Sequence, residues 1–120
     1  MVKTFWDRTA KIYDRFMRKD QEAYRQMYAL IRPVVRHKQV LELAAGTGLI
    51  AKNIVHSADH IEATDASEEM ITQAKQGAQS AKLHFSVQDM FCLPYAAQSF
   101  DVVIVSNALH IVPEPEKALA

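Results

Sequence analysis

The chain has little that would suit a secreted, membrane-bound or disordered protein. Cys92 is the single cysteine among 120 residues, so no disulfide can form within the chain and a reducing compartment is expected. No apolar run approaches the roughly 20 residues that span a bilayer, and the charged residues 1–8 lack the apolar core of a signal peptide. The composition is 49% hydrophobic without low-complexity tracts, which argues against disorder. We expect a cytoplasmic globular domain without a membrane partner.

Residues for metal binding or nucleophilic catalysis are equally scarce. His37, His56, His60 and His84 show no spacing typical of metal ligands, and Cys92 is isolated. No Ser–His–Asp arrangement can be assembled from the sequence. We therefore expect no metal site.

The formal net charge is zero, but the charge is unevenly distributed. Residues 1–38 hold ten Lys and Arg against four Asp and Glu, a net of +6, and residues 39–120 hold the reverse, a net of −6. A basic arm of this kind can approach RNA, and a steep salt dependence of RNA binding would be its signature. The plainer interpretation, surface helices with solvated Lys and Arg, is favoured over RNA.

The first 38 residues are predicted to form two helices that act as a lid or arm. Residues 4–18 follow a 3.6-residue period with an unusually aromatic face. That face either packs on the core or closes over a ligand, with Tyr13 or Phe5 excluding water. A second helix is predicted from about 20 to 31 and is expected to end before Pro33, because the residue preceding a proline avoids the helical region.

Residues 39–120 alternate between strand and helix patterns and are expected to form one ligand-binding domain. Strands are predicted over residues 40–44, 61–64, 83–87 and 100–106, helices after Gly48 and Ser67, loops over 90–99 and 107–112, and a helix start at Pro113. This alternation predicts an α/β fold with a Rossmann-like open parallel sheet.

Polar residues recur where the predicted strands end. Glu42, Asp65, Asp89 and Asn107 lie at or near the ends of four successive strands. Ligands of open parallel sheets bind beyond these carboxyl ends. The first strand also leads into a turn, residues 46–48 (GTG), whose glycines allow close approach to a ligand. The sequence therefore predicts a ligand site at this edge of the sheet.

A nicotinamide dinucleotide is one ligand that this turn could hold. Residues 46–51 (GTGLIA) fit the pattern G-x-G-x-x-A, and Asp65 lies 19 residues after Gly46, near the spacing of a ribose-binding acid. Glu42 opposes this interpretation, because it would bring negative charge to the pyrophosphate. Asp89 has no standard task in dinucleotide binding. An NAD(P)-dependent oxidoreductase therefore remains an alternative, as does a non-catalytic cofactor-binding or interaction fragment.

The motifs in combination resemble the class I S-adenosylmethionine-dependent methyltransferases, in particular the small-molecule, ubiquinone-biosynthesis-like group. They are residues 42–48 (ELAAGTG), 65–67 (DAS) with Met70, 89–90 (DM), 93–95 (LPY), 99–103 (SFDVV), and 5–7 (FWD) with 13–14 (YD). The resemblance extends from about residue 5 to residue 116. Ala44 is the one departure in the first motif, since it replaces the usual first glycine and brings a methyl group to the turn.

The resemblance implies S-adenosyl-L-methionine as cofactor and S-adenosyl-L-homocysteine as product. Asp65 would hold the ribose diol of the cofactor, and the Asp89 carboxylate and the Met90 N–H would hold its adenine. The other cofactor-binding residues implied are Ala66 and Met70 at the adenine faces, Gly46 and Gly48 with Ala44 at the amino acid tail, Glu42 and Asn107 near the ammonium, and Tyr13 in the lid.

Methyl transfer from a sulfonium is an in-line displacement in which a dedicated base is optional, because positioning supplies most of the catalysis. His110 is the only plausible base near this site, and a packing or surface histidine is the favoured alternative. The methyl acceptor is expected to be a small molecule that the sequence does not identify.

The family generally continues with a fifth strand and an antiparallel hairpin, and this chain is expected to stop before them. The fourth strand would then be a sheet edge whose run of residues 102–105 (VVIV) has no protecting charge or proline. We expect another copy to cover this edge, through strand pairing or a swapped segment, and hence a homo-oligomer, or else a chain that is a fragment.

Overall fold

The computed structural model describes residues 21–77, 80–96, 99–106 and 110–112. Of residues 110–112 it describes the backbone only. The predicted helix over residues 4–18, and Tyr13 with it, lies outside the described residues. Asn107 and the helix start predicted at Pro113 also lie outside them.

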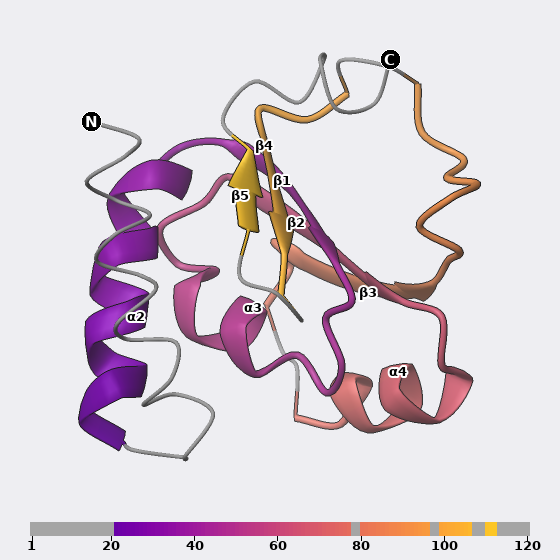
Figure 1. Cartoon of the computed structure of the whole chain (residues 1–120), viewed down its shortest axis with the longest axis horizontal. Helices are drawn as coiled ribbons and strands as arrows, with labels where there is room; N and C mark the ends of the chain where they lie inside the picture. The colour runs from indigo at the N-terminus through magenta and orange to yellow at the C-terminus, as the bar shows by residue number, and fades with distance from the viewer. Residues whose placement is uncertain (1–20, 78–79, 97–98, 107–109, 113–120) are drawn as a thin grey trace.

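The described residues form a five-stranded sheet with helices against it (Figure 1). In chain order the elements are α2 (Gln21–Val35), β1 (Gln39–Leu43), α3 (Leu49–Ile54), β2 (His60–Asp65), α4 (Glu68–Lys75), β3 (Leu83–Val87), β4 (Val102–Val105) and β5 (His110–Val112). The strand order is β3-β2-β1-β4-β5, with β1 to β4 parallel and β5 antiparallel to β4. The predicted open parallel α/β sheet is confirmed. No helix within the described ranges is long and apolar enough to cross a membrane.

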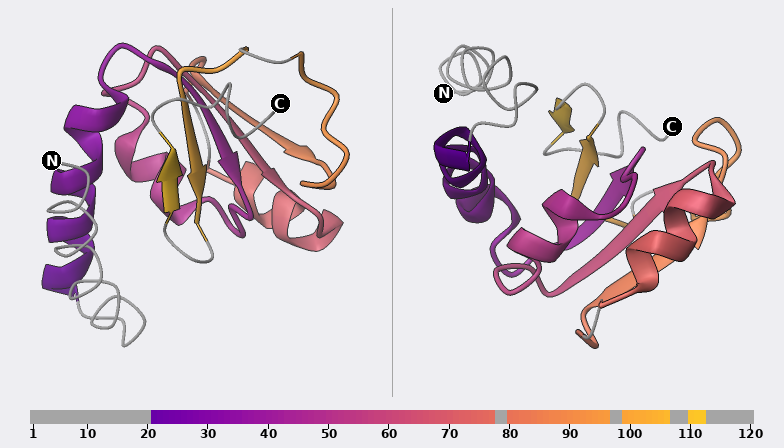
Figure 2. Two further views of the ribbon diagram at one scale, coloured as in Figure 1. Left: turned by 45° about the horizontal axis from the view of Figure 1, so that its top comes forward. Right: turned by 90° about the horizontal axis from the view of Figure 1, so that it is seen from below.

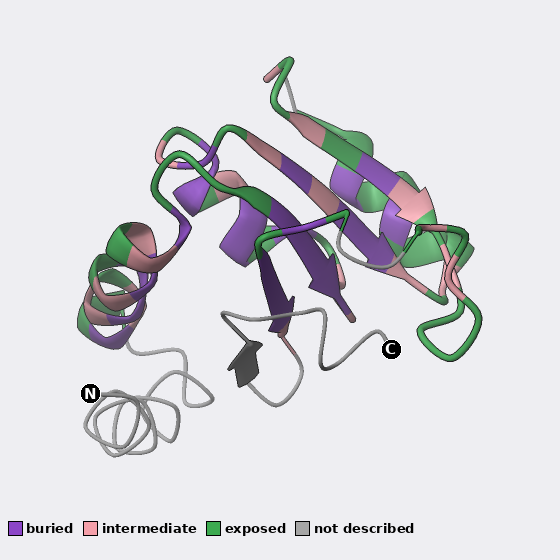
Figure 3. Ribbon diagram, turned by 90° about the horizontal axis from the view of Figure 1, so that it is seen from above, coloured by how far each residue is buried: buried purple, intermediate pink, exposed green. Residues whose placement is uncertain are grey.

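The larger core lies between the sheet and its three helices, with α3 and α4 against one face (Figure 2) and α2 beside α3. It contains Met27, Ile31 and Val35 of α2, all fully buried. The smaller core lies on the other face around Leu41 and Phe100. Figure 3 shows β1 and β4 buried along most of their length, whereas β2 is buried at three of its six positions and β3 is buried only at Phe85. β1 and β4 are therefore the strands enclosed on both faces.

Helix α2 does not end before Pro33, contrary to the sequence prediction. It continues to Val35, whose side chain is fully buried one turn beyond Ile31 on the same face. A proline here removes one helical hydrogen bond, and burial of Val35 compensates for that loss. Two residues beyond the end of the helix, His37 adopts a left-handed φ of 59° of the kind found after helix C-termini.

The prediction that one edge of β4 is uncovered is also wrong. β1 pairs with one side of β4, and β5 pairs with the other in the register Val103 to Val112 and Val105 to His110. Residues 110–112, predicted as loop and turn, form this strand because Ile111 and Val112 are β-branched residues that suit a ladder. The open edge from which a homo-oligomer was predicted is therefore absent from the described part of the chain.

Candidate cofactor site

The turn after β1 is built from residues with left-handed backbone. Ala44, Gly46 and Gly48 have φ of 55°, 61° and 82°. A Cβ at Gly48 would lie 2.6 Å from Cζ of Phe85, whereas a Cβ at Gly46 would meet nothing within 4 Å. Gly48 is therefore required both for its backbone conformation and for the close packing of the turn against β3.

The Asp65 carboxylate joins this turn to the start of α4. Its Oδ2 accepts a hydrogen bond of 2.9 Å from the Gly46 N–H, and its Oδ1 accepts one of 2.9 Å from the Ser67 N–H. A carboxylate has about four acceptor positions, so two backbone donors leave both oxygens able to accept further bonds. Asp65 is half-buried and keeps this acceptor capacity at the carboxyl end of β2.

Glu42 lies near the end of β1 and is 1% exposed. The Ser106 hydroxyl donates a hydrogen bond to its Oε2, while its Oε1 has no partner among the described residues. Burial raises the pKa of Glu42 to about 7; the Ser106 hydrogen bond opposes the increase and the negative charge of Asp65 adds to it. Glu42 is therefore more readily protonated than an ordinary glutamate.

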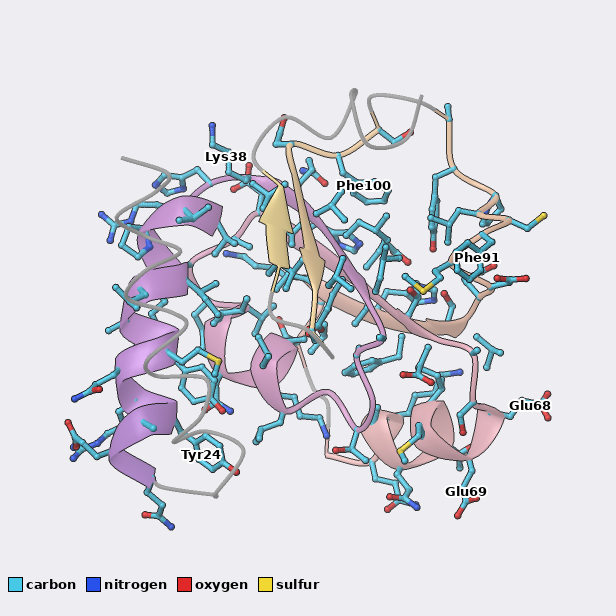
Figure 4. The ribbon with its side chains drawn as sticks, viewed as in Figure 1. Tyr24, Lys38, Glu68, Glu69, Phe91 and Phe100 are labelled. Carbon is cyan, nitrogen blue, oxygen red and sulfur yellow. The ribbon has the colours of Figure 1, made fainter. Side chains whose placement is uncertain are left out.

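The loop after β3 brings a third acid to the same edge of the sheet. Asp89 accepts a 2.9 Å bond from the Phe91 N–H at Oδ1, and its Oδ2 has no partner within the described ranges. The Gln88 N–H donates to the Asp65 carbonyl at 3.0 Å, which ties this loop to β2. Met90 is 39% exposed and Phe91, on the same loop in Figure 4, is 91% exposed.

A cleft of about 110 Å³ opens where these segments meet. Its lining consists of Ala44, Thr64, Asp65, Ala66, Gln88 and Met90. Four of these six, Ala44, Asp65, Ala66 and Met90, are residues that the sequence predicts as cofactor-binding. Thr64 and Gln88 were missed, although each adjoins a strand-end acid in the sequence, which is the signal that could have identified them.

The remaining predicted site residues are placed less completely. Met70 is 43% exposed on α4 and does not line the cleft. The His110 backbone lies in β5 opposite Val105, and its side chain is outside the description, as are Tyr13 and Asn107. Within the described segments no group of three or more His, Cys, Asp or Glu residues could hold a metal ion.

A second, larger hollow of about 660 Å³ lies against α3 and α4. It is lined by Thr47, Leu49, Lys52, Gln73 and Gln76 and therefore contains no carboxylate. Because it lacks the strand-end acids, the smaller cleft is the better candidate for a ligand with hydroxyl and amine donors.

Together, the parallel sheet, the glycine turn and the acids at the carboxyl ends of β2 and β3 are typical of Rossmann-like α/β domains. Residues 40–120 match the family model described as a methyltransferase domain. The chain belongs to the class I S-adenosylmethionine-dependent methyltransferases, as its motifs predicted.

Individual relatives agree with this assignment. The chain is 32% identical to a demethylmenaquinone methyltransferase of Clavibacter sepedonicus over 98% of this chain and 50% of the relative. It is 29% identical to a ubiquinone biosynthesis O-methyltransferase of Coxiella burnetii over 71% of this chain and 37% of the relative. The chain thus spans half or less of the length of these relatives. The solved [4+2]-cyclase SpnF shares the fold, with a TM-score of 0.63 and 24% identity over 69% of this chain and 34% of that one.

Proposed function

We propose that the chain binds S-adenosyl-L-methionine at the carboxyl ends of β1, β2 and β3 and provides the cofactor-binding part of a methyltransferase. The observation that supports this most strongly is the Asp65 carboxylate, which the Gly46 and Ser67 N–H groups hold at the cleft. Its unused acceptor positions suit the two hydroxyls of a ribose. When bound, the cofactor would supply a methyl group that is activated for transfer by the positively charged sulfur that carries it.

The adenine would lie between the loop after β3 and the start of α4. Asp89 Oδ2 is available for the exocyclic amine, and the Met90 N–H for a ring nitrogen. Ala66 lines the cleft, and Met70 exposes apolar surface on the neighbouring helix, so both suit the adenine faces. The cleft is smaller than the roughly 300 Å³ of common ligand pockets, and we propose that Tyr13 of the lid completes it.

The amino acid tail would lie along the glycine turn. Gly46 and Gly48 allow the backbone to approach it, while the Ala44 methyl group lines the cleft and narrows that approach. Glu42 and Asn107 would face the ammonium. Catalysis would then consist of holding the acceptor in line and excluding water, with His110 as the candidate base.

The acceptor that we propose is a small molecule related to quinones, because the two relatives are named demethylmenaquinone methyltransferase and ubiquinone biosynthesis O-methyltransferase. The single, exposed Cys92 supports a cytoplasmic location.

Titration calorimetry with S-adenosylhomocysteine and with NADH tests the cofactor assignment. Asp65→Asn should weaken S-adenosylhomocysteine binding by roughly ten- to hundredfold, because charge-assisted hydrogen bonds are lost. Glu69→Gln is the matched control, since Glu69 is exposed on the side of α4 that faces away from the sheet (Figure 4). Binding of NADH alone would refute the proposal and favour the oxidoreductase alternative.

A further inference from the structure

The adenine loop, residues 89–95, carries the two groups that are proposed to hold the adenine, but its backbone is not tied to the sheet. Gln88, just before it, is the last residue with a backbone bond to β2. Within the loop, the Phe91 N–H donates to the Asp89 carboxylate at 2.9 Å, and the Cys92 N–H donates to the Asp89 carbonyl at 3.0 Å. The loop backbone makes no other hydrogen bond with the described residues. The position of the loop relative to the sheet therefore depends on side chains.

Two side chains of the adenine loop provide that attachment. Leu93 and Tyr95 are its partly buried residues, whereas the others are exposed (Figure 3). Both pack against the smaller core around Leu41 and Phe100. The Tyr95 ring meets the Phe100 ring edge to face at a centroid distance of 5.1 Å. Leucine supplies apolar contact alone, whereas the tyrosine hydroxyl can also fix a direction through a hydrogen bond.

The Tyr95 hydroxyl reaches a carboxylate on the sheet. It donates to Oε2 of Glu62 on β2 at 3.5 Å, and Ser86 of β3 is its second polar neighbour. Glu62 is itself held by two rings, because His60 Nε2 lies 2.8 Å from Oε1 and His84 Nδ1 lies 2.8 Å from Oε2. An ionised carboxylate has about four acceptor positions and can take all three donors. The histidines therefore fix the carboxylate, and the carboxylate fixes the tyrosine.

We propose that Tyr95 is a positioning residue for cofactor recognition: held by Glu62, it fixes the adenine loop so that the Asp89 carboxylate meets the exocyclic amine of the adenine. This inference rests on the proposed function. It assigns a role to a cluster of histidine and glutamate side chains that does not line the cleft. The cluster acts on the ligand only through the tyrosine and the loop.

Titration calorimetry of the full chain with S-adenosylhomocysteine and with S-inosylhomocysteine tests this role. The second ligand has a carbonyl oxygen in place of the exocyclic amine, so the Asp89 carboxylate has no donor to accept from. The wild type should therefore bind the adenosine ligand more tightly, by roughly ten- to hundredfold. Tyr95→Phe keeps the ring that packs on Phe100 and removes the hydroxyl. It should weaken S-adenosylhomocysteine binding roughly three- to tenfold and S-inosylhomocysteine binding by less than about twofold.

Glu62→Gln tests whether the tyrosine acts through this carboxylate. It should reduce the preference for the adenosine ligand as Tyr95→Phe does, and the double variant should show little further loss, because the two residues form one contact. Tyr28→Phe and Glu69→Gln are the matched controls, since Tyr28 lies in the larger core and Glu69 is exposed on α4. Both controls should keep the wild-type ratio of the two affinities.

A second measurement follows the loop itself in the ligand-free chain. Amide hydrogen exchange at Phe91 and Cys92, whose N–H groups bond within the loop, should be faster in Tyr95→Phe than in the wild type. A hydroxyl that only stabilised the fold would lower the free energy of unfolding and leave the ratio of the two affinities unchanged.

The outcomes separate this inference from the proposed function. If either Tyr95→Phe or Glu62→Gln keeps the wild-type ratio of affinities, the inference is overturned and the proposed function stands. Equal binding of the two ligands by the wild type overturns the inference as well, because the amine is then not recognised. If the wild type binds neither ligand, the inference and the proposed function are both overturned.

Discussion

Gly48→Ala should be among the most damaging single-methyl additions in the molecule. The position has a φ of 82°, where a side chain costs about 1–2 kcal/mol. The added Cβ would also lie 2.6 Å and 2.7 Å from two ring atoms of Phe85, and overpacking of this kind costs about 1–3 kcal/mol. The smaller entropy of the unfolded alanine chain returns less than about 1 kcal/mol. We expect the free energy of unfolding to decrease by about 2–4 kcal/mol.

Gly46→Ala is the matched control for this prediction. Its φ of 61° is also left-handed, but its Cβ would meet nothing within 4 Å, so only the backbone cost of about 1–2 kcal/mol applies. Urea denaturation followed by circular dichroism measures both variants. Adding Phe85→Leu to Gly48→Ala should recover part of the lost free energy of unfolding. The double variant should then be less destabilised than the sum of the two single variants predicts. Equal losses at Gly46 and Gly48 would refute the argument that the turn is packed against β3.

Three further substitutions test other parts of the account by chemical denaturation. Burial alone would raise the pKa of Glu62, but its hydrogen bonds with His84 and His60, both 2.8 Å, hold it below the ordinary 4.5. The stabilisation that the ionised Glu62 carboxylate provides is therefore present above pH 4.5 and is lost as the pH falls through its lower folded-state pKa. Glu62→Gln should therefore decrease the free energy of unfolding by about 1 kcal/mol at pH 7 and by less in acid. A loss independent of pH would contradict this. Tyr28→Phe removes a buried hydroxyl without a described partner and should leave stability unchanged or raise it by up to about 1 kcal/mol; a loss above about 1 kcal/mol would indicate a hydrogen bond there. Ala44→Gly should relieve a left-handed alanine and change stability by less than about 1 kcal/mol, whereas a larger loss would show that the methyl group is needed for packing.

The sheet could be predicted from the sequence because each strand carries its own local signal. The β-branched run of Val102–Val105 and the acids at or near the ends of β2 and β3 are visible without any structure. The extent of α2 was not predictable in this way, since it depends on the burial of Val35 by residues distant in the sequence. β5 was missed for a similar reason: three residues show too short a pattern, and their pairing with β4 is a tertiary contact.

The site could be predicted as a set of positions but not as a network. Asp65 was identified from its place after a strand, whereas its bonds to Gly46 and Ser67 depend on the turn geometry. Glu42 was expected to bring a full negative charge to the turn. Its pKa of about 7 follows from burial and from Asp65, which spacing in a sequence does not reveal.

The location of the cofactor is the central claim, and an amide chemical-shift map of the isotope-labelled chain titrated with S-adenosylhomocysteine tests it most directly. We expect the largest changes at Gly46, Ala66 and Met90, which surround the Asp65 carboxylate. Changes concentrated instead at Lys52 and Gln73, in the hollow against α3 and α4, would contradict the account.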